Sequence, residues 1–156
     1  MGMESYFLNI HISYSIDINE LLSDIYNDFS IKKYNKISNK KTFDGKTFIL
    51  NDCVVLTINQ NENYICICLE ACYANYDRSL KIMYELYNML LNKYENIYLS
   101  YGLITTNHYL TDYDLFKNWV NNCNPQKREV FMKKYGQFSK NILPNDFYNF
   151  IRKHKN

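Results

Sequence analysis

The stretch Tyr64-Ile-Cys-Ile-Cys-Leu-Glu-Ala-Cys72 is almost entirely apolar, which is typical of a strand in the middle of a sheet. A helical pattern follows over residues 77–94, where apolar side chains recur every three or four positions. A second strand pattern covers residues 97–105, in which every other residue falls on one apolar face. The three segments predict a β-α-β unit, whose strands run parallel if both belong to one sheet.

The segments before this unit predict one strand, one helix and then a meander. Residues 8–16 alternate between apolar and polar side chains, which indicates a half-buried strand. Asp17 and Glu20 have the spacing of a capping box, and the predicted helix carries an apolar stripe that ends with Tyr26 and Phe29. Residues 30–41 are rich in lysine and indicate a loop. An Asp44-Gly45 turn and the strand patterns that follow predict an antiparallel meander over residues 42–72.

Three short helices are expected after the β-α-β unit. They begin near Thr111, at Asn124-Pro125 and at Leu143-Pro144, and Gly136 is a suitable end for the second. The whole chain, residues 3–156, is therefore expected to form a single α+β domain with element order β-α-β-β-β-α-β. Its sheet is expected to be mostly antiparallel with two helices on one face. The first 105 residues resemble the ferredoxin-like plan, and the last helices would wrap an edge or the open face.

The composition disfavours an enzyme. Four scattered glycines cannot build a phosphate-binding loop, and no motif for a nucleophile or a paired carboxylate site is present. His108 stands alone in a loop, and Asp112 and Asp114 sit at a helix start, where they favour the helix dipole. The sequence therefore predicts no catalytic residue and no cofactor.

The cysteines favour packing over metal binding. Cys66, Cys68 and Cys72 share one face of their predicted strand, and thiolates on a strand can bind zinc. The Cys-x-x-Cys knuckles of zinc ribbons are missing, however, so we expect buried thiols and no metal. The odd number of cysteines, five, and the lack of a secretory pattern predict a cytoplasmic protein. No stretch of the sequence is apolar enough to predict a membrane span.

The β-α-β unit predicts where a binding surface lies. If its two strands are parallel, their carboxyl ends leave the sheet at one edge, and the loops that follow lie close together. Both loops are rich in tyrosine, asparagine and aspartate, and tyrosine is favoured at protein interfaces. The predicted partner-binding residues are Tyr73, Asn75, Tyr76, Asp77, Asn107, His108, Tyr109, Asp112 and Tyr113.

The β-α-β-β-α-β pattern from Leu8 to Thr105 and these two loops give the chain a resemblance to a known class of proteins. A small α+β chain without a catalytic constellation resembles the immunity proteins of bacterial contact-dependent and other polymorphic toxin systems. The resemblance implies a non-catalytic protein that binds a cognate toxin domain, often a nuclease, and blocks its active site. Residues 1–126 carry a net charge of −4, which would suit a basic partner.

Two alternatives stay open. Tyr64, Tyr98 or Tyr101 on an exposed sheet could stack nucleic-acid bases, while residues 127–156, of net charge +6 and rich in aromatic side chains, follow the phosphates. The third hypothesis is a small enzyme that uses His108, and it has the least support in the sequence.

Overall fold

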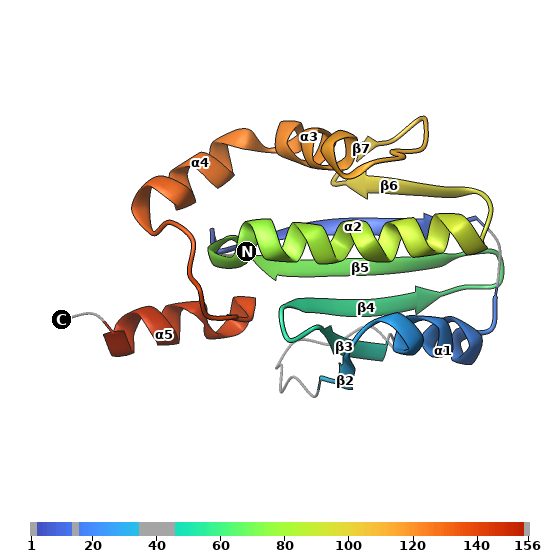
Figure 1. Ribbon diagram of the computed structural model, residues 1–156, viewed down its shortest axis with the longest axis horizontal. Coiled ribbons are helices and arrows are strands. Elements are labelled where there is room, and N and C mark those ends of the chain that lie inside the picture. Colours follow the sequence, from blue (N-terminus) through green and yellow to red (C-terminus); the bar gives the residue numbers. More distant parts are fainter. Residues whose placement is uncertain (1–2, 14–15, 35–45, 155–156) are drawn as a thin grey trace.

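The structure is a computed structural model that describes residues 3–13, 16–34 and 46–154 (Figure 1). These residues form one seven-stranded sheet in the order β2-β3-β4-β5-β1-β6-β7, and every neighbouring pair is antiparallel. The strands are β1 (Ser5–Ile12), β2 (Ile31–Lys33), β3 (Lys46–Leu50), β4 (Val54–Gln60), β5 (Ile65–Cys72), β6 (Ile97–Tyr101) and β7 (Ile104–Thr105). The helices are α1 (Ile18–Asp28), α2 (Tyr76–Lys93), α3 (Tyr113–Cys123), α4 (Pro125–Lys134) and α5 (Phe147–His154).

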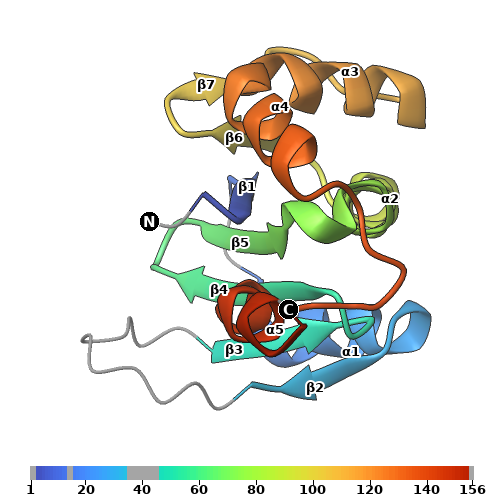
Figure 2. The same cartoon turned by 90° about the vertical axis from the view of Figure 1, so that its left-hand side faces the viewer.

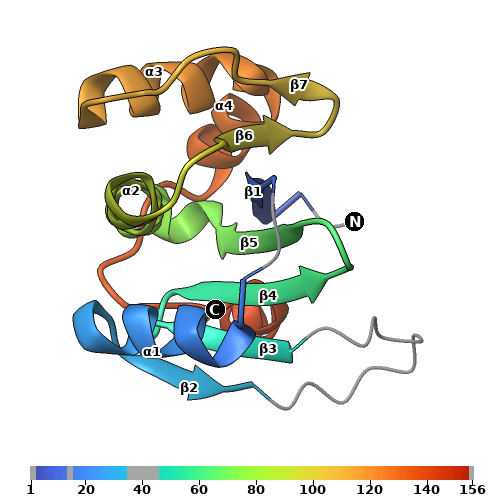
Figure 3. The ribbon, with the colours of Figure 1, turned by 90° about the vertical axis from the view of Figure 1, so that its right-hand side faces the viewer.

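The predicted fold class is confirmed. Strand β1 lies between β5 and β6 and is antiparallel to both, so β5 and β6 run parallel to each other as the β-α-β pattern requires. Helices α1 and α2 lie side by side on one face of the sheet (Figure 2, Figure 3). This is the split β-α-β arrangement of the ferredoxin-like plan, with β2 and β3 inserted between α1 and β4.

The side chains of β1 alternate between the two faces of the sheet, as the sequence predicts. Leu8, Ile10 and Ile12 are fully buried beneath the helices, whereas the residues between them are only half-buried on the opposite face. Asp17 caps α1 by accepting a hydrogen bond from the Asn19 backbone amide at 2.8 Å. The prediction that Tyr26 belongs to the buried apolar stripe of α1 is wrong, because this residue is 69% exposed.

The insertion between α1 and β4 differs from the prediction. Residues 31–33 form the edge strand β2 rather than part of a loop, because β3 offers them a hydrogen-bonding partner. The predicted Asp44-Gly45 turn lies outside the described residues. A turn that the sequence analysis missed joins β3 to β4: Asn51 and Asp52 have φ angles of 49° and 56°, and the Cys53 amide donates to the Leu50 carbonyl at 3.1 Å.

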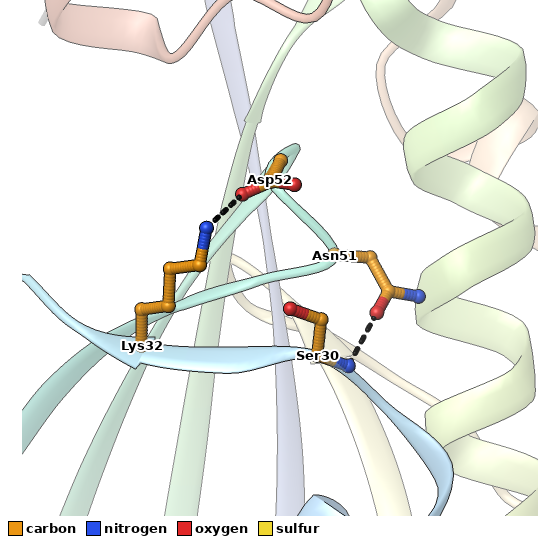
Figure 4. Close-up of polar contacts among 4 residues, drawn as sticks. All are labelled: Ser30, Lys32, Asn51 and Asp52. Atoms are coloured by element: carbon orange, nitrogen blue, oxygen red, sulfur yellow. Dashed lines mark hydrogen bonds and ion pairs between the residues drawn. The ribbon is translucent and has the colours of Figure 1, made fainter.

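This turn also holds the edge strand in place (Figure 4). The Ser30 amide donates to Asn51 Oδ1 at 2.8 Å, and the Asn51 amide donates to the Ser30 carbonyl at 2.7 Å. Lys32 Nζ lies 3.2 Å from Asp52 Oδ1 in an exposed ion pair. Asparagine and aspartate tolerate the left-handed backbone of the turn, so the same two residues shape the turn and bind β2.

The predicted strand 97–105 is not continuous. The backbone of Gly102 has a φ of 61°, and the chain reverses there into a hairpin of β6 and β7. A left-handed backbone is readily adopted by glycine, and this explains why the strand breaks at this residue. The reversal changes where the residues after Thr105 lie, with consequences for the predicted site.

The three C-terminal helices begin and end close to the predicted residues. Asn124 caps α4 through a hydrogen bond to the Lys127 amide, and Gly136, with a φ of 71°, follows its end. The aromatic side chains of this region pack on one another, and the rings of Phe131 and Phe147 lie 5.1 Å apart and are buried. The side chains of these two residues are therefore part of the hydrophobic core. Among the described helices, none is long and apolar enough to cross a bilayer.

Candidate binding face and adjacent hollow

One face of the sheet is not covered by the described helices (Figure 2, Figure 3). Its side chains come from the positions that alternate with the core, and most are polar or small. We call this surface the open face; it comprises Phe7, Asn9, His11, Thr57, Asn59, Cys66, Cys68, Glu70, Tyr98 and Ser100.

Three rings line up across the open face. His11 lies opposite Tyr98 in the register of β1 and β6, and their rings stack with centroids 4.5 Å apart and planes inclined by 10°. The ring of Tyr64 lies on the same face, 6.3 Å from that of His11 and inclined by 22°. Both tyrosines are more than one third exposed. Tyr64, His11 and Tyr98, the aromatic row, therefore stack on one another, so the His11 ring lies between the two tyrosines and a further planar group can stack only on the outer face of a tyrosine.

His11 is held in one orientation by its neighbours. Its Nε2 lies 2.7 Å from Ser100 Oγ, within a hydrogen bond, while Nδ1 is buried and has no hydrogen-bond partner among the described residues. Burial lowers the pKa of His11 from its usual 6.5, because the charged imidazolium loses solvation. The imidazole is therefore neutral near pH 7 and suits a stacking role.

A hollow of about 440 Å³ adjoins the aromatic row at Tyr98. It lies where β6 begins and where the chain returns from β7. Three predicted partner-binding residues line it together with Tyr98. The full lining is Ser13, Asn96, Ile97, Tyr98, Thr106, Asn107, His108 and Tyr109.

The other predicted loop is mostly buried, so its proposed role needs correction. Tyr73, Asn75 and Tyr76 are 1%, 1% and 5% exposed. Tyr73 and Tyr76 pack against other aromatic rings, and the Tyr76 hydroxyl donates to Asn121 Oδ1 at 2.6 Å. Burial raises the pKa of Tyr76 to about 12. These side chains offer almost no surface to a partner, because the C-terminal segment folds over them.

Asn75 binds the C-terminal segment through two hydrogen bonds. Its amide nitrogen donates to the Lys140 carbonyl at 2.8 Å, and its Oδ1 accepts from the Ile142 amide at 2.8 Å. The guanidinium of Arg78 donates to the carbonyl oxygens of Phe138 and Ser139 nearby. The polar composition of this loop thus reflects internal hydrogen bonding.

The remaining predicted residues lie along α2 and α3. Asp77 is exposed and hydrogen-bonds to Gln137, and Asp112 caps α3 through the Leu115 amide at 2.9 Å. Tyr113 is half-buried, with its ring 5.4 Å from that of Tyr84. The expectation that all nine residues form one surface is wrong: the hairpin at Gly102 carries residues 107–109 back to the opposite end of β6.

The contact between His11 and Tyr98 does not follow from the sequence alone. Both residues occupy outward positions of their strands, so the alternation placed each on an exposed face, but it did not give the order of the strands. The contact depends on β6 pairing with β1 in the register that sets these two residues opposite each other.

Two of the five cysteines meet on the open face. Cys66 Sγ and Cys68 Sγ are 3.7 Å apart. Cys66 is buried, as are Cys53 and Cys72, whereas Cys68 is half-buried. The amide of Asn59 on β4 donates to Cys68 Sγ at 3.5 Å. Across the residues that the structure describes, no three or more histidine, cysteine or acidic side chains are grouped so as to hold a metal ion.

Compared with known protein families, with curated proteins and with solved structures, the chain matches none of them.

Proposed function

We propose that this chain is a non-catalytic, cytoplasmic binding protein that neutralises a partner protein, as the immunity proteins that it resembles do for a cognate bacterial toxin. The observation that carries the proposal is the apolar surface of the β6–β7 hairpin. Leu103 is fully exposed at its tip, and Ile104 is 46% exposed. Aliphatic side chains displayed in this way favour a protein partner, because burying them against it is stabilising.

The position of the hairpin supports the same proposal. Strand β7 is an edge of the sheet and pairs on one side with β6, so its other side can accept a strand from a partner. Tyr109 follows at the end of the hollow and is 50% exposed. A tyrosine beside a hollow is a suitable anchor for an interface, and the exposed leucine adds apolar area that a partner can bury.

The charge distribution suggests the character of the partner. The first 126 residues, which include the hairpin and the hollow, carry a net charge of −4. A basic partner, such as a nuclease domain, would be attracted to this part of the chain, and its association would slow with rising salt.

The experiment is co-expression with the protein encoded beside this chain in its native genome. We expect a stable complex and protection of the host cell. Leu103→Asp should weaken the complex at least tenfold, about 1.4 kcal/mol. Tyr26→Asp on α1 is the matched control, because Tyr26 is also exposed, and it should bind as the unmodified chain does. No complex, or equal binding by both variants, contradicts the proposal.

A second candidate function has its own supporting observation. The aromatic row lies on an uncovered sheet face, and bases of single-stranded nucleic acid stack on such rings for about 1–3 kcal/mol each. Tyr101 does not belong to it, because it is half-buried and its hydroxyl lies 3.4 Å from that of Tyr73. The C-terminal basic residues are also partly engaged, since Lys127 donates to the Ser5 carbonyl and Arg128 to the Asn121 carbonyl.

The test is binding of a labelled single-stranded oligonucleotide at low salt. We expect Tyr98→Ala to weaken binding about fivefold or more and Tyr26→Ala to leave it unchanged. Binding should weaken as salt rises. Absence of binding at low salt removes this candidate and leaves the protein partner.

A further inference from the structure

The hollow of about 440 Å³ lies against the outer face of the Tyr98 ring. Strand β6 lies between β1 and β7, and the ring of Tyr98 is covered on the β1 side by His11. On the β7 side the chain returns past β6, where the Thr106 amide donates to the Leu99 carbonyl at 3.0 Å. Tyr98 and residues 106–109 line the hollow, whereas His11 does not. The hollow is therefore on the side of the ring that His11 leaves uncovered.

We propose that this hollow binds an arginine side chain of the partner protein, with the guanidinium stacked on the outer face of Tyr98. The inference rests on the proposed partner function and names the chemical group that the partner inserts. A planar guanidinium stacks on aromatic rings, and it is more weakly hydrated than the ammonium of lysine. It is therefore the cation that gains most from a ring beside a hollow.

The lining of the hollow suits a group that only donates hydrogen bonds. A guanidinium carries five N–H donors and no acceptor. Ser13, Asn96 and Thr106 contribute side-chain oxygens that can accept from it. Thr106 Oγ1 is held in position by the Leu99 amide, which donates to it at 3.0 Å. The described part of the lining contains no lysine or arginine, so it offers no fixed cation that would repel the ligand.

The end of the sheet that holds the hollow is acidic. Strand β1 ends where β5 and β6 begin (Figure 1). Exposed carboxylates lie close to these strand ends in the chain, at Asp17, Glu62 and Glu95. Lys93 precedes β6 as well, but it forms an ion pair with Asp24, so its charge is compensated. The remaining negative charge attracts a cationic side chain and repels phosphates, which favours arginine over a nucleic-acid base as the occupant.

The experiment compares two peptides of equal charge, hexa-arginine and hexa-lysine, for binding to the full chain at low salt. We expect hexa-arginine to bind at least about fivefold more tightly, because its guanidinium groups can stack on the ring. During the titration with hexa-arginine, the amide NMR signals of Asn96, Thr106 and Tyr109 should shift, since these residues line the hollow.

The two tyrosines of the aromatic row provide a matched pair of variants. Tyr98→Leu should remove the preference for arginine, whereas Tyr64→Leu should keep it. Tyr64 is 38% exposed and Tyr98 37%, and Tyr64 does not line the hollow. Asn107→Lys, at an exposed position of the lining, leaves the ring in place and adds a cation to the hollow, so it should also remove the preference. Thermal unfolding of each variant separates a lost site from a lost fold.

Three results would overturn the inference. One is equal binding of the two peptides, and another is a preference for arginine that survives both Tyr98→Leu and Asn107→Lys. The third is tighter binding of single-stranded oligothymidine than of hexa-arginine at the same salt, with loss of that binding in Tyr98→Leu, because it assigns the hollow to a base.

Failure of this inference is distinguishable from failure of the proposed function. A co-expressed complex that Leu103→Asp weakens supports the partner protein even if the two peptides bind equally. A preference for arginine that depends on Tyr98, found without any co-expressed complex, supports the chemistry of the hollow and contradicts the proposed partner.

Discussion

The ring of Tyr98 stacks on that of His11 across the junction of β6 and β1, with centroids 4.5 Å apart. On the other side of His11 lies Tyr64. This arrangement buries part of the imidazole, orients it through Ser100 and joins the open face to the hollow. Because the two rings can meet only when β6 pairs with β1, this contact reports on the strand order of the sheet.

We expect His11 to titrate below 6.5, because its burial penalises the protonated ring. As the pH falls below 6.5, the imidazole takes up a proton more readily in the unfolded chain than in the folded chain. The free energy of unfolding therefore decreases as the pH falls. His11→Gln should remove this part of the pH dependence. The measurement is the His11 titration by NMR together with the unfolding free energy of both proteins between pH 5 and 7.5. A His11 pKa at or above 6.5 would contradict the burial of the ring.

Asn75→Ala should destabilise the protein by about 1–3 kcal/mol, since it leaves the buried Ile142 amide without its partner and removes the shorter of the two hydrogen bonds to the Lys140 carbonyl. Asp77→Ala, at an exposed neighbour, should cost less than about 1 kcal/mol. Chemical denaturation of the two variants measures the difference. Equal effects would show that Asn75 does not fasten the C-terminal segment.

The hydrogen bond to Cys66 holds the pKa of the Cys68 thiol below its ordinary value, and Asn59→Ala should raise this pKa, because the thiolate loses a second hydrogen-bond donor. Side chains near Cys68 on the open face include Cys66 and Glu70 on its own strand, Asn9 on β1 and Thr57 on β4. The pH dependence of thiol alkylation, followed by mass spectrometry at Cys68, measures the change. A rate profile identical to that of the unmodified chain would exclude the role of Asn59.

Gly102→Ala should destabilise the hairpin by about 1–2 kcal/mol, because its φ of 61° is unfavourable for a residue with a Cβ atom. No atom lies within 4 Å of the added methyl position, so the cost comes from the backbone alone. Hydrogen exchange of the Thr106 amide, which donates to the Leu99 carbonyl at 3.0 Å, should become faster. Unchanged exchange and stability would contradict the turn geometry.

Much of the fold follows from local patterns. The apolar run of β5 and the caps at Asp17 and Asn124 depend on neighbours in the chain, and each is found where the sequence indicates. The alternation predicted over residues 8–16 is found in β1, which begins and ends earlier, and α3 is capped by Asp112 rather than Thr111. Strand β2 and the Asn51-Asp52 turn were missed. A strand of three residues has too short a pattern to recognise, and it exists because β3 lies beside it.

The predicted site was less accurate for a related reason. Composition indicates that a loop is polar, but it does not say whether its polar groups face a partner or the rest of the chain. Asn75 and Tyr76 resemble interface residues in sequence, and both are used for internal hydrogen bonds. The break at Gly102 was also missed, because the alternating pattern continues through it.

The sequence by itself determined the α+β class, the two helices that cover one face, and the parity that directs His11 and Tyr98 away from the core. Backbone periodicity and side-chain burial are enough for these features. Only the tertiary structure decided that β1 lies between β5 and β6, that His11 meets Tyr98, and that residues 107–109 border a hollow. Contacts between distant segments depend on strand order and on register, and neither is encoded in the pattern of a single segment.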